Sequence, residues 1–194
     1  MSTLHIKITD ETHSPLNEAM VLVAYPNGTK KSVGTDQSGT CAIDLYRDDI
    51  SVRLIAAASG HYPYQCEFDL KKIQGPVAIT MNQGDGQWGN SAIFNGRTGY
   101  IPRIEGRLNP IHDTSDRYYL YGDSLAINGG GRQPVHFNPG EWLAIEDSQS
   151  MECSVKFIIV EDHFTLLEYT APTHYQHQEQ LETNTGCASD AASS

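Results

Sequence analysis

Three short stretches near the start of the chain decide its fold class. Residues 14–24 are SPLNEAMVLVA, residues 34–45 are GTDQSGTCAIDL, and residues 50–62 are ISVRLIAAASGHY. Each stretch contains a short apolar or alternating run, and the runs are separated by Pro, Gly, Asn, Asp and Ser, which favour turns. Short strands broken by turns at this spacing are typical of a small antiparallel β-sandwich.

The rest of the first 82 residues fits the same pattern. The expected strands cover residues 4–8, 20–25, 30–33, 40–45, 50–56, 64–70 and 77–81. Asn27-Gly28 predicts a hairpin turn because both residues tolerate positive φ. The Asp36 carboxylate is expected to cap the backbone amides of the turn that Gly39 closes. No sustained 3.6-residue apolar period is present, so helices should be scarce.

Residues 3–82 resemble the carboxypeptidase regulatory-like domain, a transthyretin-like β-sandwich. The residues that carry the resemblance are Asp10, Pro15, Leu16, Ala19, Val21, Val23, Thr35, Asp36, Gly39, Ile43, Leu45, Val52, Leu54, Gly60, His61 and Tyr62. The resemblance implies a module that accompanies a catalytic or transport domain without doing chemistry itself.

The remaining sequence predicts a second β domain and a tail. A Gly-rich junction at residues 83–102 follows the first domain, which spans residues 1–82. Six or so short strands are expected in residues 103–170, as a small β-barrel or β-sandwich. The His-, Gln-, Glu- and Ser-rich residues 171–194 are expected to be disordered, because they cannot bury enough apolar surface. The predicted fold class is therefore all-β.

Charge and composition exclude several kinds of partner. The 194 residues carry a net charge of -11, and residues 84–171 contain twelve acidic against six basic residues. No Lys/Arg stripe is available for phosphates, which argues against nucleic acid, and the acidity opposes an anionic membrane surface. The sequence contains neither a membrane-length apolar run nor a signal-peptide pattern, so a cytoplasmic location is expected. Cys41, Cys66, Cys153 and Cys187 are interpreted as reduced thiols, although a Cys41–Cys66 bridge would be possible in an exported protein.

Candidate chemical motifs are weak. Residues 84–89 match G-x-G-x-x-G, but residues 90–102 contain Gly96, Gly99 and Pro102 and cannot supply the helix that a dinucleotide site requires. His174 and His177 have metal-ligand spacing but no third ligand nearby. Cys153 could pair with His136 or His163 as a thiolate nucleophile, yet its alternating strand favours a core thiol. The sequence therefore predicts no catalytic residue, cofactor or metal.

Surface recognition is the predicted function. The chain is expected to be a non-enzymatic interaction or accessory module that docks a protein partner, for example an enzyme, through loops or a sheet edge. Tyr62, Tyr64, Trp88 and Tyr100 are the predicted partner-binding residues, since large amphipathic rings beside glycines make good interface anchors. The alternatives are a carbohydrate-binding module, which needs an exposed aromatic platform, and a Cys/His-dependent hydrolase.

Overall fold

The computed structural model describes residues 2–45, 51–73 and 75–174. Strands dominate these residues, and the one helical element among them is the 3-10 turn η1 (Leu70–Lys72). The prediction of an all-β fold is therefore confirmed. Within the described part of the chain, no helix is long and apolar enough to cross a bilayer. Most of the predicted disordered tail lies outside the described residues, whereas Thr173–His174 form a short strand, β16.

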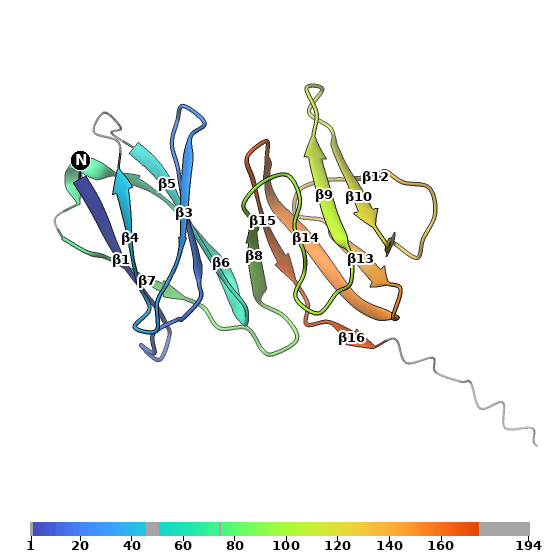
Figure 1. Ribbon diagram of the computed structural model, residues 1–194, viewed down its shortest axis with the longest axis horizontal. Coiled ribbons are helices and arrows are strands. Elements are labelled where there is room, and N and C mark those ends of the chain that lie inside the picture. The colour runs from blue at the N-terminus through green and yellow to red at the C-terminus, as the bar shows by residue number, and fades with distance from the viewer. Residues whose placement is uncertain (1, 46–50, 74, 175–194) are drawn as a thin grey trace, which may run out of the picture.

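The first sandwich packs two sheets face to face (Figure 1). Sheet A has the strand order β4–β1–β7, and sheet B has the order β3–β2–β5–β6. These strands are β1 (Ser2–Asp10), β2 (Met20–Ala24), β3 (Lys30–Gly34), β4 (Thr40–Leu45), β5 (Ser51–Ala58), β6 (His61–Asp69) and β7 (Val77–Met81). Strand β1 pairs antiparallel with β4 and parallel with β7. Alternate side chains such as Ile6, Val21 and Leu54 fill the core between the sheets.

Four tight turns share the same hydrogen-bond pattern. In each, an aspartate carboxylate accepts from the backbone N–H groups of the residues two and four positions later in the chain. The aspartates are Asp10, Asp36, Asp113 and Asp147. The residue three places after each aspartate has a positive φ, and these residues are His13, Gly39, Asp116 and Ser150. At Gly39 a Cβ would also overlap the Ile8 carbonyl oxygen, so only glycine fits there. The expected capping role of Asp36 is confirmed, and hydrogen bonds from Ser38 and Thr40 lower its pKa to about 2.

The second half of the chain forms another two-sheet sandwich. Sheet C has the order β11–β13–β14–β15–β8, with β16 also paired to β14, and sheet D has the order β12–β10–β9. These strands are β8 (Asn90–Phe94), β9 (Arg107–His112), β10 (Tyr118–Asp123), β11 (Leu125–Ile127), β12 (Val135–Phe137), β13 (Trp142–Asp147), β14 (Met151–Glu161) and β15 (Phe164–Tyr169). Leu120, Ile145, Val155 and Phe157 lie in the core between the sheets. In the described residues this half is a sandwich rather than a closed barrel.

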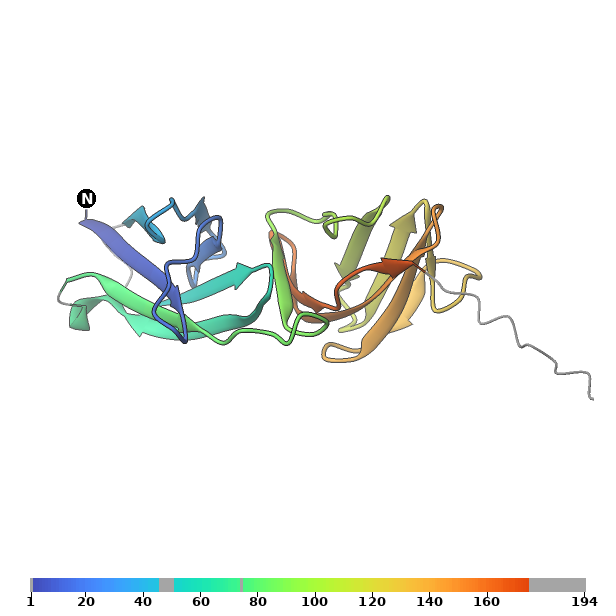
Figure 2. The same cartoon turned by 90° about the horizontal axis from the view of Figure 1, so that it is seen from below.

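The two sandwiches are joined by a third apolar layer, called the seam here, which consists of Leu22, Ile55, Ala57, Phe164 and Leu166. Each of these side chains is at most 2% exposed. On β2 and β5 they alternate with residues of the first core, so sheet B has apolar side chains on both faces. Figure 2 shows the two sandwiches side by side along the long axis of the molecule. The seam therefore covers one end of the outer face of sheet C, the face turned away from its own core.

Polar contacts border the seam on two sides. The Ser91 hydroxyl donates to the carbonyl oxygen of His61 at 2.8 Å and accepts from the Ala58 N–H at 3.1 Å. The Arg53 guanidinium pairs with the Glu161 carboxylate at 2.9 Å. Because the Ser91 hydrogen bonds link β8 to the backbone of β5 and β6, and the exposed Arg53–Glu161 ion pair links β5 to β14, these contacts connect the two sandwiches.

Candidate functional site

The four predicted partner-binding residues do not form one cluster. Tyr62 and Trp88 are both 39% exposed. Both lie at the Gly-rich loop, where the Tyr62 ring packs against Gly89. Tyr64 is half-buried against the first core, and burial raises the pKa of its hydroxyl. Tyr100 is 64% exposed and follows Gly99, whose N–H donates to the carbonyl oxygen of Leu108 in sheet D.

The loop that carries Trp88 is held by hydrogen bonds to the Asp85 carboxylate and to two other segments of the chain. The Asp85 carboxylate accepts hydrogen bonds from the N–H groups of Gln87 and Trp88, at 3.0 and 2.7 Å. The Gly84 N–H donates to the Gly60 carbonyl oxygen, and the Ala171 N–H donates to that of Gln87. A Cβ on Gly84 would overlap the Trp88 carbonyl oxygen, so the chain can cross itself only with glycine here. The loop thus presents Trp88 in one fixed position.

Trp88 belongs to a surface cluster that the sequence does not reveal. Its ring meets the ring of Trp142 edge-on, with the centroids 5.1 Å apart. The Lys156 ammonium lies 4.8 Å from the centroid of Trp142 and pairs with the Glu168 carboxylate at 2.6 Å. We call these four residues, Trp88, Trp142, Lys156 and Glu168, the tryptophan patch. They were missed as a group because three of them come from different strands, and only the register of sheet C aligns them.

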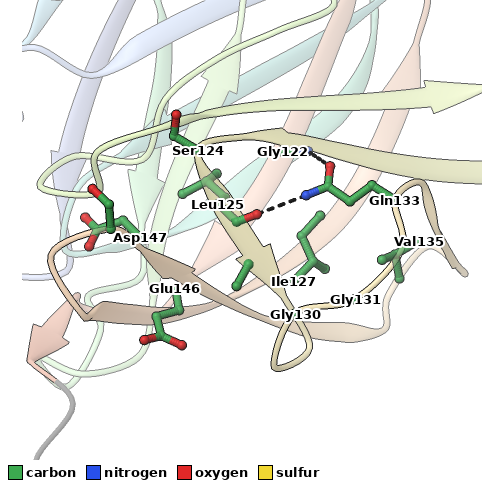
Figure 3. Close-up of a pocket in the computed structure, with 12 residues that line it drawn as sticks. Gly122, Ser124, Leu125, Ile127, Gly130, Gly131, Gln133, Val135, Glu146 and Asp147 are labelled. Carbon is green, nitrogen blue, oxygen red and sulfur yellow. Dashed lines mark hydrogen bonds between the residues drawn. The ribbon is translucent and has the colours of Figure 1, made fainter.

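A hollow of the second sandwich lies elsewhere, between β11, β13 and the loop that precedes β12 (Figure 3). Its volume is about 540 Å³, and Leu125, Ile127 and Val135 form its apolar wall. The Gln133 side chain accepts from the Gly122 N–H at 2.7 Å and donates to the Leu125 carbonyl oxygen at 2.9 Å. Both polar atoms of the Gln133 side chain are therefore hydrogen-bonded to the backbone around the hollow.

The Asp147 carboxylate, at the other end of this hollow, is likewise occupied by hydrogen bonds to the backbone. Its carboxylate accepts from the N–H groups of Glu105, Gln149 and Met151, at 2.8, 2.8 and 2.9 Å. Burial alone would raise the pKa of Asp147, but these three hydrogen bonds outweigh it and lower the pKa. The hollow is thus lined by groups that support the fold, and we do not assign a ligand to it.

The cysteine chemistry considered from the sequence is not supported. Cys153 is 5% exposed in the core of the second sandwich, and burial, with a smaller effect from Asp147, raises the pKa of its thiol to about 12. Its proposed histidine partners lie elsewhere, because the His136 ring packs on Tyr119 and His163 lies beside Gly28. Burial, and to a lesser degree Asp36, also raises the pKa of Cys41 to about 11. Neither thiol is suited to act as a nucleophile near neutral pH.

The described cysteines Cys41, Cys66 and Cys153 are free thiols, and Cys187 lies outside the described residues. Within the described chain, no group of three or more His, Cys, Asp or Glu side chains is arranged to hold a metal ion.

Comparison with known proteins changes the functional interpretation. No protein-family model matches the chain. The 3' cyclic ADP-D-ribose synthase AaTIR of Aquimarina amphilecti is 25% identical to it over 167 residues, which cover 84% of this chain and 48% of the relative. The chain therefore spans about half the length of that relative. The match is longer than either sandwich, so it includes parts of both.

The expectation of a non-enzymatic accessory module is wrong in the light of this similarity, because the matched relative is an enzyme. The sequence alone led to the wrong conclusion because we interpreted residues 3–82 as a module that does no chemistry. Neither the residue pattern nor the composition contains a nucleotide-processing motif that would have corrected it.

Proposed function

We propose that the chain is the β-rich region of an enzyme that synthesises a cyclic ADP-D-ribose, and that its two sandwiches serve this catalysis as one unit. The observation that carries the proposal is the match to the Aquimarina synthase, which extends over 84% of the chain and across both sandwiches. A likeness limited to one common β-sandwich would support the fold alone. A likeness across both supports a shared arrangement of the two.

The seam supports the same proposal. A buried apolar layer between domains resists their separation, whereas a flexible linker would leave them to move independently. Leu22, Ile55 and Phe164 are each at most 1% exposed in this layer. In the proposed enzyme, the two sandwiches therefore move together.

The charge distribution bears on where the nucleotide binds. An ADP-ribose carries two phosphates, and residues 84–171 contain twelve acidic against six basic residues. An acidic surface repels a diphosphate. We place nucleotide binding on the part of the enzyme that corresponds to the unmatched half of the relative, and this catalytic part is the proposed protein partner.

Two narrower expectations belong to this proposal. The seven strands of the first sandwich support the resemblance of residues 3–82 to carboxypeptidase regulatory-like domains, which accompany catalytic domains. The free thiols of Cys41, Cys66 and Cys153, in the described part of the chain, support a reducing compartment, and we propose the cytoplasm.

The proposal is tested by replacement. The matched region of the Aquimarina synthase is exchanged for this full chain, and a second variant lacks the region altogether. Both are incubated with NAD⁺, in which ADP-ribose carries nicotinamide as a leaving group on the anomeric carbon, and 3' cyclic ADP-ribose is measured by liquid chromatography with mass spectrometry. The exchanged enzyme is expected to form product at least about ten times faster than the deletion variant, which corresponds to about 1.4 kcal/mol of transition-state stabilisation. Equal rates in the two variants would overturn the proposal.

A further inference from the structure

The outer face of sheet C is covered at one end and open at the other. Phe164 and Leu166 on β15 lie under the first sandwich in the seam. Glu168 lies two residues further along the same face of β15. Its cross-strand neighbour is Lys156, and the next cross-strand neighbour of Lys156 is Trp142. Ser91, the other neighbour of Glu168, contacts the first sandwich. The tryptophan patch is therefore continuous with an interface that the fold already uses.

The patch has the composition of an interface anchor rather than of ordinary surface. Trp88 and Trp142, the only two tryptophans of the chain, meet here and are 39% and 37% exposed. Below them the Lys156 and Glu168 side chains are 23% and 13% exposed. Rigid tryptophans beside a partly desolvated ion pair bind partners strongly, because little side-chain entropy is lost on association.

We propose that the tryptophan patch is the surface on which the catalytic part of the cyclic ADP-D-ribose synthase docks. This inference rests on the proposed function, in which that part corresponds to the half of the relative that the chain does not match. Glu146 and Glu152 lie on the same face of sheet C, as a cross-strand pair beyond the patch. The docking surface of the catalytic part should therefore have an apolar centre for the tryptophans and a basic rim for these carboxylates.

Two other occupants fit the patch less well. A nucleotide could stack on Trp88, but Asp85, Glu146 and Glu152 would oppose its phosphates. A second copy of the chain would bring together two molecules that each carry a net charge of -11. Neither occupant explains why the patch adjoins the seam.

The test uses the exchanged synthase described above, with Trp88→Ala or Trp142→Ala in the inserted chain. Tyr121→Ala is the matched control, because Tyr121 is 41% exposed on sheet D and lies outside the patch. Each tryptophan substitution should lower product formation at least about ten-fold, and the control should change it less than about two-fold. The thermal melting curves of the free chain with each substitution show whether it still folds, and only variants that fold are compared.

The outcomes separate the docking proposal from the proposed function. If the unsubstituted exchanged enzyme forms no more product than the deletion variant, the proposed function is wrong and the docking proposal falls with it. If it is active and the tryptophan variants match the Tyr121 control, the docking proposal alone is wrong. Saturable quenching of tryptophan fluorescence in the free chain by ADP-ribose would overturn docking in favour of direct nucleotide binding. A dimer in sedimentation that Trp142→Ala abolishes would overturn it in favour of self-association.

Discussion

The seam and the tryptophan patch occupy the same face of sheet C, yet only the seam is closed. In the seam, Phe164 and Leu166 are 1% and 0% exposed beneath the first sandwich. In the patch, Trp88 and Trp142 keep more than a third of their surface in contact with solvent, although a fixed loop and an ion pair hold them in place. The difference shows that apolar side chains on one face of sheet C are covered at one end and exposed at the other, and an exposed apolar surface of this kind is typical of an interaction site.

The largest effect expected from this comparison is on stability. Phe164→Ala should lower the free energy of unfolding by about 3–5 kcal/mol, because it opens a cavity in the seam. Trp142→Ala should cost only roughly 1–2 kcal/mol in the free chain, because much of its ring already lies in water. Urea denaturation of both variants measures the difference. A larger loss of unfolding free energy for Trp142→Ala than for Phe164→Ala would contradict the distinction between the closed seam and the open patch.

The loop that presents Trp88 gives a smaller effect. Gly84→Ala should cost about 1–3 kcal/mol, because its Cβ would overlap the Trp88 carbonyl oxygen and force the loop to shift. Gly34→Ala is the matched control, since nothing lies within 4 Å of a Cβ at Gly34 and its φ is not positive. Denaturation gives the stabilities, and the wavelength of tryptophan emission shows whether the patch has moved. An unchanged stability and spectrum for Gly84→Ala would mean that the loop is not fixed.

The smallest expected effect concerns pH and the exposed turn of Asp36, which belongs to neither surface. The folded-state pKa of Asp36 is about 2, below its ordinary value of 3.8. Its stabilising contribution is therefore fully present above about pH 4 and is lost as the pH falls through about 2. Asp36→Asn should lower the melting temperature at pH 7, and the gap to the wild type should close toward pH 2. A gap that stays constant with pH would contradict the assigned role of the carboxylate.

Much of the fold can be predicted from local pattern. The apolar run at residues 20–24 and the alternation at residues 77–81 mark β2 and β7, and the latter was predicted with its observed bounds. Strand β8 was assigned to the Gly-rich junction because glycines and asparagines surround it. Strand β9 was missed because Pro110 lies inside it, which is tolerated on an edge strand. The strand predicted at residues 64–70 begins earlier in the structure, because β6 starts at His61 and is again an edge strand that contains a proline, Pro63.

The candidate site was harder to predict than the fold. Trp88 was singled out correctly as exposed, because it lies between glycines in a loop. Its contact with Trp142 depends on how the loop folds over β13, more than fifty residues away. The alignment of Trp142 with Lys156 and Glu168 depends on strand register, which one sequence does not specify. The enzymatic interpretation rests only on similarity to an enzyme.

Hydrogen–deuterium exchange tests most directly whether the outer face of sheet C is closed at the seam and open at the tryptophan patch. The exchange of the free chain is compared with the exchange of the chain inside the exchanged synthase. The account predicts that peptides from residues 162–167, in the seam, exchange slowly in both proteins. Peptides from residues 84–90, in the tryptophan loop, should exchange at least about ten times more slowly in the exchanged synthase than in the free chain. Equal exchange of residues 84–90 in the two proteins would show that the patch stays open in the enzyme, and would contradict the account.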